Sequence, residues 1–215
     1  MRFARLCVIA TGMACAVWGQ GLPANPITGK YHVHHLLIVH SGGFQDMRSL
    51  GGSMTFDGNG SYTFTGMQMV GAGAESNFTA SGTYSVNPNG TVTLSNPQRP
   101  GAQIQAKYGR GMIVGSSVEV GANTYDLFAG VPAAEGITEA TINSDYWVAG
   151  VEFVNAAPPI SRATFFSLRP ARQAPAITVF GQATNLGTKS VTQAVTGAST
   201  SVNSDGTGGL IFPLP

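Results

Sequence analysis

Four histidines are the residues of this chain whose type and spacing come closest to a reactive site. They are His32, His34, His35 and His40, all in one largely apolar segment. Because alternate residues of a strand share a face, an extended segment directs His35 to one side and the other three to the opposite side. A His-x-His pair on a strand is a known way to hold zinc or another transition metal. The pattern predicts a metal site of His32, His34 and His40, although a hydrogen-bonded or half-exposed histidine row explains it more simply.

Such a metal site needs at least one further ligand. The available carboxylates are Asp46, Asp57 and Glu75, provided that folding brings one of them near. Both cysteines, Cys7 and Cys15, lie in an N-terminal segment that resembles a cleaved leader, so the remaining chain has no thiolate and no disulfide. No cofactor is predicted.

Other constellations point to structure more than to catalysis. The segment 57–60 begins like a calcium loop, but Tyr62 stands where that loop requires glycine, which favours a hairpin turn. No Gly-x-Ser-x-Gly motif is placed as a nucleophile elbow. Asp126, Glu119 and Glu152 could form a carboxylate pair only if folding joined them. The sequence therefore predicts no enzyme and no catalytic residue.

Residues 1–20 have the pattern of a secretory signal peptide. Arg2 and Arg5 give a positive start, and 6–17 is apolar but too short to cross a bilayer as a helix. Loss of the two arginines leaves 9 basic residues (11 − 2) against 10 acidic ones, so nothing points to nucleic acid as a partner. No later segment is long and apolar enough for a transmembrane helix. The expected location is secreted, periplasmic or at the cell surface.

The composition predicts an all-β protein. Charged residues make up only 10 %, and 29 glycines accompany many Ser, Thr, Asn and Val residues, which suits strands joined by tight turns. The turns 57–60 and 87–90 are strong hairpin signals, and consecutive hairpins predict an antiparallel meander. It could close as a barrel or pack as a sandwich. The expected strands are 31–39, 53–56, 61–65, 78–86, 91–94, 103–108, 112–118 and 124–131 in a first unit (21–134), then 146–154, 163–168, 177–183, 191–202 and 208–212 in a second (135–215).

The second unit is predicted to be an incomplete copy of the first. An offset of 115 residues places 31–39 on 146–154, with tyrosine first and valine last in both. After one inserted residue, the turn 87–90 falls on 203–206, and both turns begin with Asn and end with Gly. Turn glycines and strand hydrophobics are the positions that a duplicated fold must keep. Whether the chain is shortened after Pro215 stays open, as does the packing of the two units.

The segments 51–65 and 81–94 resemble the repeated hairpins of uncharacterised exported proteins of soil Acidobacteria. That resemblance implies a bacterial, duplicated β protein with no known activity and no functional residues to transfer. The Gly29-Lys30-Tyr31 spacing is also similar to the Gly-x-Trp of lipocalin-like barrels, which implies an interior that could hold a ligand.

These observations favour a non-catalytic exported or cell-surface protein that serves as a scaffold or interaction module, with an unknown protein or cell-surface partner. The alternative is a lipocalin-like protein that binds a small apolar ligand inside a barrel, and a further alternative is the metal protein. The ligand-binding residues, the ligand or partner and the oligomeric state are not predicted. Aromatic residues that alternate with polar ones could form a ligand platform, but an ordinary core explains them more simply: Tyr31, Tyr62, Phe64, Tyr84, Tyr125 and Phe128.

Overall fold

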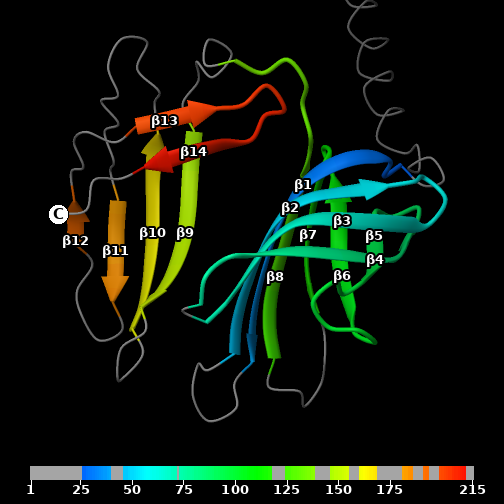
Figure 1. Ribbon diagram of the computed structural model, residues 1–215, viewed down its shortest axis with the longest axis horizontal. Helices are drawn as coiled ribbons and strands as arrows, with labels where there is room; N and C mark the ends of the chain where they lie inside the picture. The colour runs from blue at the N-terminus through cyan, green and yellow to red at the C-terminus, as the bar shows by residue number, and fades with distance from the viewer. Residues whose placement is uncertain are drawn as a thin grey trace, which may run out of the picture. The chain divides into compact units, whose positions relative to one another are not determined.

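The computed structural model describes residues 26–39, 46–71, 73–117, 124–138, 146–154, 160–168, 181–185, 191–193 and 199–211. The chain divides between Pro132 and Ala133 into two units, two residues before the boundary that the sequence suggested (Figure 1). The predicted signal peptide, His40 and Glu119 lie outside the described residues. Within the described ranges, no helix has the length and apolar character that a membrane crossing requires.

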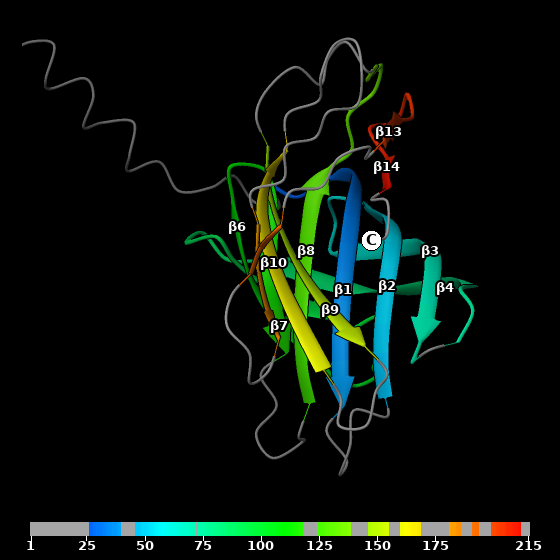
Figure 2. The same cartoon turned by 90° about the vertical axis from the view of Figure 1, so that its left-hand side faces the viewer.

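The first unit is a closed barrel of eight antiparallel strands in the order β1 to β8. Each strand is hydrogen-bonded to the next along the chain, and β1 pairs with β8 from Tyr31↔Pro132 to Val39↔Thr124. Figure 2 shows β8, β1 and β2 side by side. The all-β meander is thereby confirmed, and the barrel is the arrangement that it adopts. The strands are β1 Gly29–Val39, β2 Asp46–Phe56, β3 Ser61–Val70, β4 Ser76–Val86, β5 Thr91–Ser95, β6 Gln103–Gly109, β7 Met112–Ser117 and β8 Thr124–Pro132.

Alternate residues of each strand point into the barrel and form one hydrophobic core. At the end where β1 begins, the core is aromatic. The Phe56 ring packs edge-on against Tyr31 and Tyr84, with centroids 5.2 Å and 4.9 Å away. The Tyr84 hydroxyl donates a hydrogen bond to the Ile27 carbonyl at 2.8 Å, and Ile27 itself is fully buried. The segment before β1 therefore closes this end.

The strand β2 begins at Asp46, seven residues before the predicted 53–56. The prediction began too late because Gly51 and Gly52 look like turn residues in the sequence. In the structure, Gly52 pairs with Gly66 of β3. A Cβ atom on Gly66 would lie 2.7 Å from both Gly52 Cα and Phe64 Cζ, closer than real side chains approach. The glycines therefore leave room for the inward Phe64 ring and for a close backbone approach within a regular strand.

The second unit is also built from β-strands. Its described part contains a four-stranded antiparallel sheet in the order β12-β11-β10-β9 and a separate β13-β14 hairpin. The sequence predicted one strand over 191–202, whereas the structure has two within that range. The strands are β9 Tyr146–Val154, β10 Ile160–Leu168, β11 Gly181–Asn185, β12 Val191–Gln193, β13 Ser199–Val202 and β14 Gly208–Ile211.

Two turns, one in each unit, have the same hydrogen bonds. In the first unit, Asn87 N donates to Thr91 O at 2.8 Å and Gly90 N donates to Asn87 O at 2.8 Å. The second unit has the same pair of bonds at the positions that the offset of 116 matches, at 2.7 Å and 3.0 Å. Both turn glycines have positive φ, 80° and 82°, which glycine adopts with little strain. The 57–61 turn of the first unit has the first of these bonds as well, from Asp57 N to Ser61 O at 3.0 Å, so the internal duplication stays a prediction.

Candidate functional site

The histidine that enters the barrel is His35. Along β1, the inward positions include Val33, His35 and Leu37, and all three are buried. His32 and His34 stand between them on the outer face, where His34 is exposed and His32 is half-buried. The predicted alternation is therefore correct. The histidine inside the barrel is His35, which is not one of the three predicted metal ligands.

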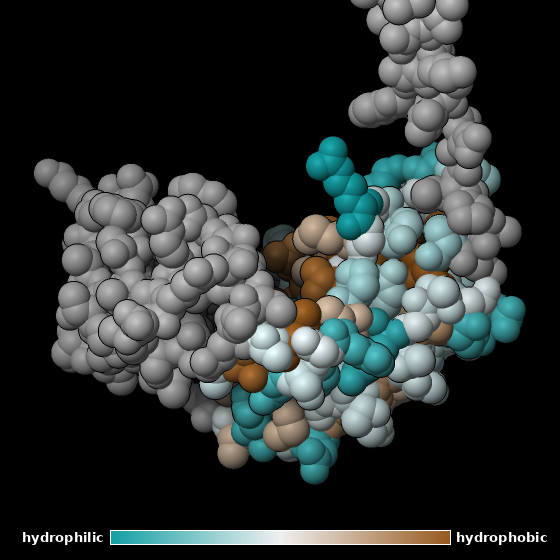
Figure 3. Space-filling model, turned by 90° about the horizontal axis from the view of Figure 1, so that it is seen from above, coloured by the Kyte–Doolittle hydropathy of each residue, from teal (hydrophilic) through white to brown (hydrophobic). Residues whose placement is uncertain are grey.

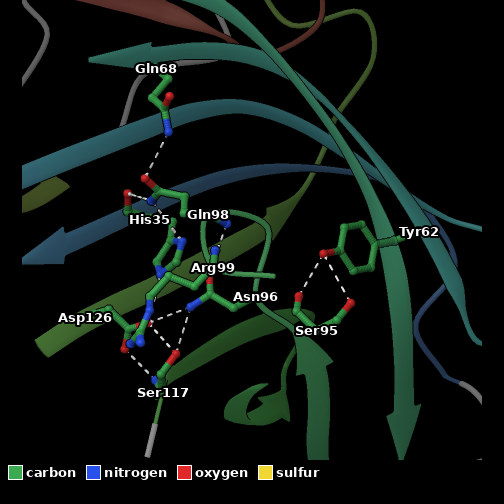
Figure 4. Close-up of polar contacts among 9 residues, drawn as sticks. All are labelled: His35, Tyr62, Gln68, Ser95, Asn96, Gln98, Arg99, Ser117 and Asp126. Atoms are coloured by element: carbon green, nitrogen blue, oxygen red, sulfur yellow. Dashed lines mark hydrogen bonds and ion pairs between the residues drawn. The ribbon is translucent and has the colours of Figure 1, made fainter. Parts of the chain in front are cut away.

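His35 forms a buried pair with Asp126 of β8 (Figure 4). The distance from His35 Nε2 to Asp126 Oδ2 is 2.9 Å, and both side chains are fully inaccessible to solvent. On the other side of the ring, Gln98 Nε2 lies 3.0 Å from His35 Nδ1 and donates to the His35 carbonyl at 3.1 Å. An amide nitrogen can only donate, so Nδ1 accepts and Nε2 carries the proton toward the carboxylate. Both ring nitrogens are therefore occupied.

The Asp126 carboxylate accepts several further hydrogen bonds. Ser117 donates to it through both its backbone N–H and its hydroxyl, the latter at 2.6 Å, and Asn96 Nδ2 lies 3.3 Å away. Burial raises the pKa of Asp126, but hydrogen bonds from His35 and Ser117 outweigh that effect and hold its pKa below the ordinary 3.8. The carboxylate is thus ionised at neutral pH in a site without solvent.

A loop between β5 and β6 carries the other polar groups into this end of the barrel. Asn96 Oδ1 accepts from the backbone N–H groups of Gln98, at 2.9 Å, and Arg99, at 3.1 Å, and so fixes the loop in a tight turn. Asn96 and Gln98 are 5 % exposed, although both are amides in a loop. Gln98 Oε1 accepts from Gln68 of β3 at 3.3 Å. The loop therefore acts as a plug and links β1, β3 and β8.

The residue types of a serine hydrolase are present here, but their connections are different. In such a triad the histidine bonds to the serine hydroxyl and the aspartate orients the histidine. Here the Ser117 hydroxyl donates to Asp126, and Asn96 Nδ2 donates to Ser117 Oγ at 2.8 Å. No His35 nitrogen is left to accept a proton from Ser117. As arranged, the cluster holds the barrel end together through hydrogen bonds, and its histidine is bonded to Asp126 and Gln98 and not to the Ser117 hydroxyl.

The predicted metal residues lie apart from this cluster. His32 and His34 are on the outer face, and the His34 ring covers Gly51 of β2, where a Cβ atom would meet His34 Cε1 at 3.1 Å. The Asp57 carboxylate accepts the N–H groups of Asn59, at 2.7 Å, and Ser61, at 2.9 Å, in a hairpin turn. Among the described residues, no group of three or more His, Cys, Asp or Glu side chains could hold a metal ion. Since His40 is outside those residues, the metal site stays a prediction.

The aromatic residues proposed as a core or ligand platform are mostly interior. Tyr62, Phe64, Tyr84 and Phe128 are buried, as is Tyr31. The exception is Tyr125, which is 64 % exposed, so the prediction that it belongs to the core was wrong. Tyr125 and Phe128 are three positions apart in one strand and therefore face opposite sides.

Neither a family model, nor a curated protein, nor a solved structure matches the chain. The resemblance of the hairpins to exported Acidobacteria proteins and to lipocalin-like barrels therefore stays a prediction.

Sequence reasoning missed the polar cluster as a unit. Two signals were available. His35 has the same phase as the inward Val33 and Leu37, and Asp126 shares its phase with the inward Phe128. A charged residue at an inward position of a strand requires a buried partner. What the sequence could not provide was the pairing of the first strand with the eighth, which brings these two residues together.

Proposed function

We propose that this chain is a non-catalytic protein, exported or displayed at the cell surface, that acts as a scaffold or interaction module. The observation that carries this proposal is the set of side chains that pack inside the first unit. Aromatic side chains occupy one end, and a hydrogen-bonded cluster with a plug loop occupies the other. A barrel that holds a small molecule needs open interior volume and a way in. We therefore expect the outer surface of the barrel to be the part that recognises a partner.

The outer surface supports an interaction role because some of its strands present polar side chains and others present large apolar ones. Outward positions of β4, β5 and β6 are mainly Thr, Ser, Asn and Gln. Outward positions of β3, β7 and β8 include large apolar side chains, and Figure 3 shows hydrophobic residues at the surface of the first unit. The exposed apolar side chains are Met67 and Met69 on β3, Met112 and Val114 on β7, and Tyr125, Leu127 and Val131 on β8. Those of β7 and β8 lie on paired strands, and a contiguous apolar patch is typical of surfaces that bind other proteins.

Export is supported by the leader-like pattern of residues 1–20. A cysteine-free barrel depends on its core and sheet hydrogen bonds in any redox environment. Expression with the native N-terminus followed by intact-mass measurement tests this part. Cleavage near residue 20 is expected, and an intact N-terminus after passage through a secretion pathway would contradict it.

The main experiment separates a filled barrel from a ligand-binding one. Native mass spectrometry and thermal shift are measured with a panel of small apolar molecules that includes benzene. The wild-type chain is expected to carry no organic molecule and to show no shift. Phe64→Ala is the matched positive control, because an apolar cavity of that size takes up benzene.

Phe64→Ala should also lower the free energy of unfolding by about 3–5 kcal/mol, so Leu94→Ala provides a milder cavity if the first variant does not fold. Binding by the cavity variants alone supports the proposal. A stoichiometric organic molecule on the wild-type chain would instead favour the lipocalin-like alternative. Reproducible turnover of a defined substrate by the wild-type chain would refute the non-catalytic assignment.

A further inference from the structure

Two hairpin turns of the first unit form a matched pair. They are the turns 57–61 and 87–91, and they contain the two Asn-Gly pairs of the sequence. In both turns the first residue donates its N–H to the carbonyl four positions later, at 3.0 Å and 2.8 Å. In both, the carbonyl of the glycine in the Asn-Gly pair accepts a tyrosine N–H from a later strand at 2.8 Å. The two turns can therefore be compared group by group.

An asparagine that is followed by glycine can lose its side-chain amide without an enzyme. The backbone nitrogen of the glycine bonds to the asparagine Cγ, the Cγ–Nδ2 bond breaks, and ammonia leaves with the glycine proton. Water then opens the resulting ring at one of its two carbonyls. The product is aspartate, or an isoaspartate whose main chain runs through the side-chain carbon. Glycine favours the reaction because it has no Cβ to hinder the approach of its nitrogen.

In the 87–91 turn, both reacting groups are held by hydrogen bonds. The Gly90 N–H donates to the Asn87 carbonyl at 2.8 Å, and Asn89 Oδ1 accepts from the Thr91 N–H at 2.9 Å. Gly90 is also buried. The reaction at Asn89 therefore requires that both hydrogen bonds break first.

In the 57–61 turn, the same groups are less restrained. Asn59 is exposed, and within the described part of the chain its side chain makes a single, long hydrogen bond, from Nδ2 to the Asp57 carbonyl at 3.5 Å. Gly60 is partly exposed, and its N–H donates to no backbone carbonyl of the described residues. It is directed to the Asp57 carboxylate, which binds the N–H groups of Ser61 and Asn59 more strongly. A carboxylate beside this N–H can accept its proton when the nitrogen attacks.

We propose that Asn59 is a modification site, where attack by the Gly60 nitrogen and then by water converts the side-chain amide to a carboxylate. An isoaspartate lengthens the main chain between residues 59 and 60. The hydrogen bonds from Asp57 N to Ser61 O and from Tyr84 N to Gly60 O lie around this link. The new carboxylate also lies close to that of Asp57, and like charges repel. The modification should therefore loosen the β2-β3 hairpin at the aromatic end of the barrel.

The test compares the two asparagines within one folded chain. The purified full chain is incubated at mildly basic pH, and fragment-ion mass spectrometry measures the conversion of amide to acid at Asn59 and at Asn89. Since two hydrogen bonds must break before Asn89 reacts, Asn59 should convert about tenfold faster or more. In urea the two rates should become similar, because glycine follows each asparagine. Equal rates in the folded chain, no conversion at Asn59, or a difference that persists in urea would each overturn the proposal.

The effect on the barrel is measured by the melting temperature after the same incubation. The wild-type chain should melt at a lower temperature as Asn59 converts. Asn59→Gln should keep its initial melting temperature, because the longer side chain does not readily form the ring. Asn77→Gln is the matched control, since Asn77 is an exposed asparagine of β4 that phenylalanine follows, and it should lose stability as the wild-type chain does. Equal losses in the two variants, or an unchanged melting temperature after Asn59 has converted, would refute the effect on the hairpin.

Discussion

The two ends of the barrel interior are built differently. At one end, Tyr31, Phe56 and Tyr84 pack ring against ring, and the segment around Ile27 covers them. At the other end, His35 and Asp126 are joined by hydrogen bonds and covered by a loop. The stability of the first end comes from close packing of rings and from buried apolar area. The stability of the second end comes from hydrogen bonds between an ionised carboxylate and the donors around it.

This difference determines how each end responds to its surroundings. Burial, together with the neighbouring Tyr108, raises the pKa of Tyr31 to about 12, so the hydroxyl stays neutral from acidic through mildly basic pH. The Asp126 carboxylate, in contrast, must lose its charge when the pH becomes low enough. The aromatic end should therefore tolerate acid, and the polar end should be the place where acid weakens the barrel.

The largest effect is expected at the aromatic end. Phe56→Ala removes a buried ring that contacts Tyr31, Tyr62 and Tyr84. The free energy of unfolding should fall by about 4 kcal/mol, through lost transfer energy and an unfilled cavity. Urea denaturation measures it, and the loss should be the same at pH 7 and pH 4. The exposed neighbour Thr55 is the control, since Thr55→Ala should change little. A loss below about 1 kcal/mol would show that the ring is not tightly packed.

A somewhat smaller loss is expected at the polar end. Asp126→Ala leaves the His35 N–H and the two Ser117 donors without their acceptor, which should cost about 3 kcal/mol at pH 7. Asp57→Ala is the matched control, because that carboxylate also accepts backbone N–H groups but lies in an exposed turn. Equal losses for both variants in urea denaturation would contradict the importance of the buried pair.

The smallest effect is a dependence on pH. The pKa of Asp126 is lowered on folding, so its contribution is fully present above the unfolded value of 3.8 and is lost as the pH falls through the folded value. The difference in unfolding free energy between the wild-type chain and Asp126→Asn should therefore shrink as the pH falls below about 4. Denaturation series at pH 7 and at pH 3 measure it. Asp57 also has a lowered pKa, through hydrogen bonds from Ser61 and Asn59, so Asp57→Asn is measured alongside. A constant difference for Asp126→Asn would contradict the assignment.

Local patterns predicted much of the fold. Alternation identified the eight strands of the first unit, and the glycine-rich turns placed its hairpins, because strand faces and turn conformations depend on residues close in sequence. The start of β2 was missed because Gly52 is explained by residues of a neighbouring strand. Glycine is needed at this position to make room for Gly66 and Phe64 of β3. A local pattern contains no information on such a partner.

The polar cluster could be predicted only in part. Alternation separated His35 from His32 and His34, and that separation is correct. The metal prediction used the outward pair, His32 and His34, because a His-x-His spacing can be recognised in the sequence alone. The partners of His35 come from β8 and from the 96–102 loop, and Asn96 and Gln98 look like ordinary loop residues. Closure of the barrel makes them interior.

The pairing of the first strand with the last also bears on how fast the barrel forms. Every other strand pair of the first unit is a hairpin, which can form within microseconds, but the His35–Asp126 contact joins residues 91 positions apart. The entropy of closing so long a loop must be overcome before the cluster can stabilise anything. The meander should therefore assemble first, and the β1-β8 seam should close last and limit the folding rate.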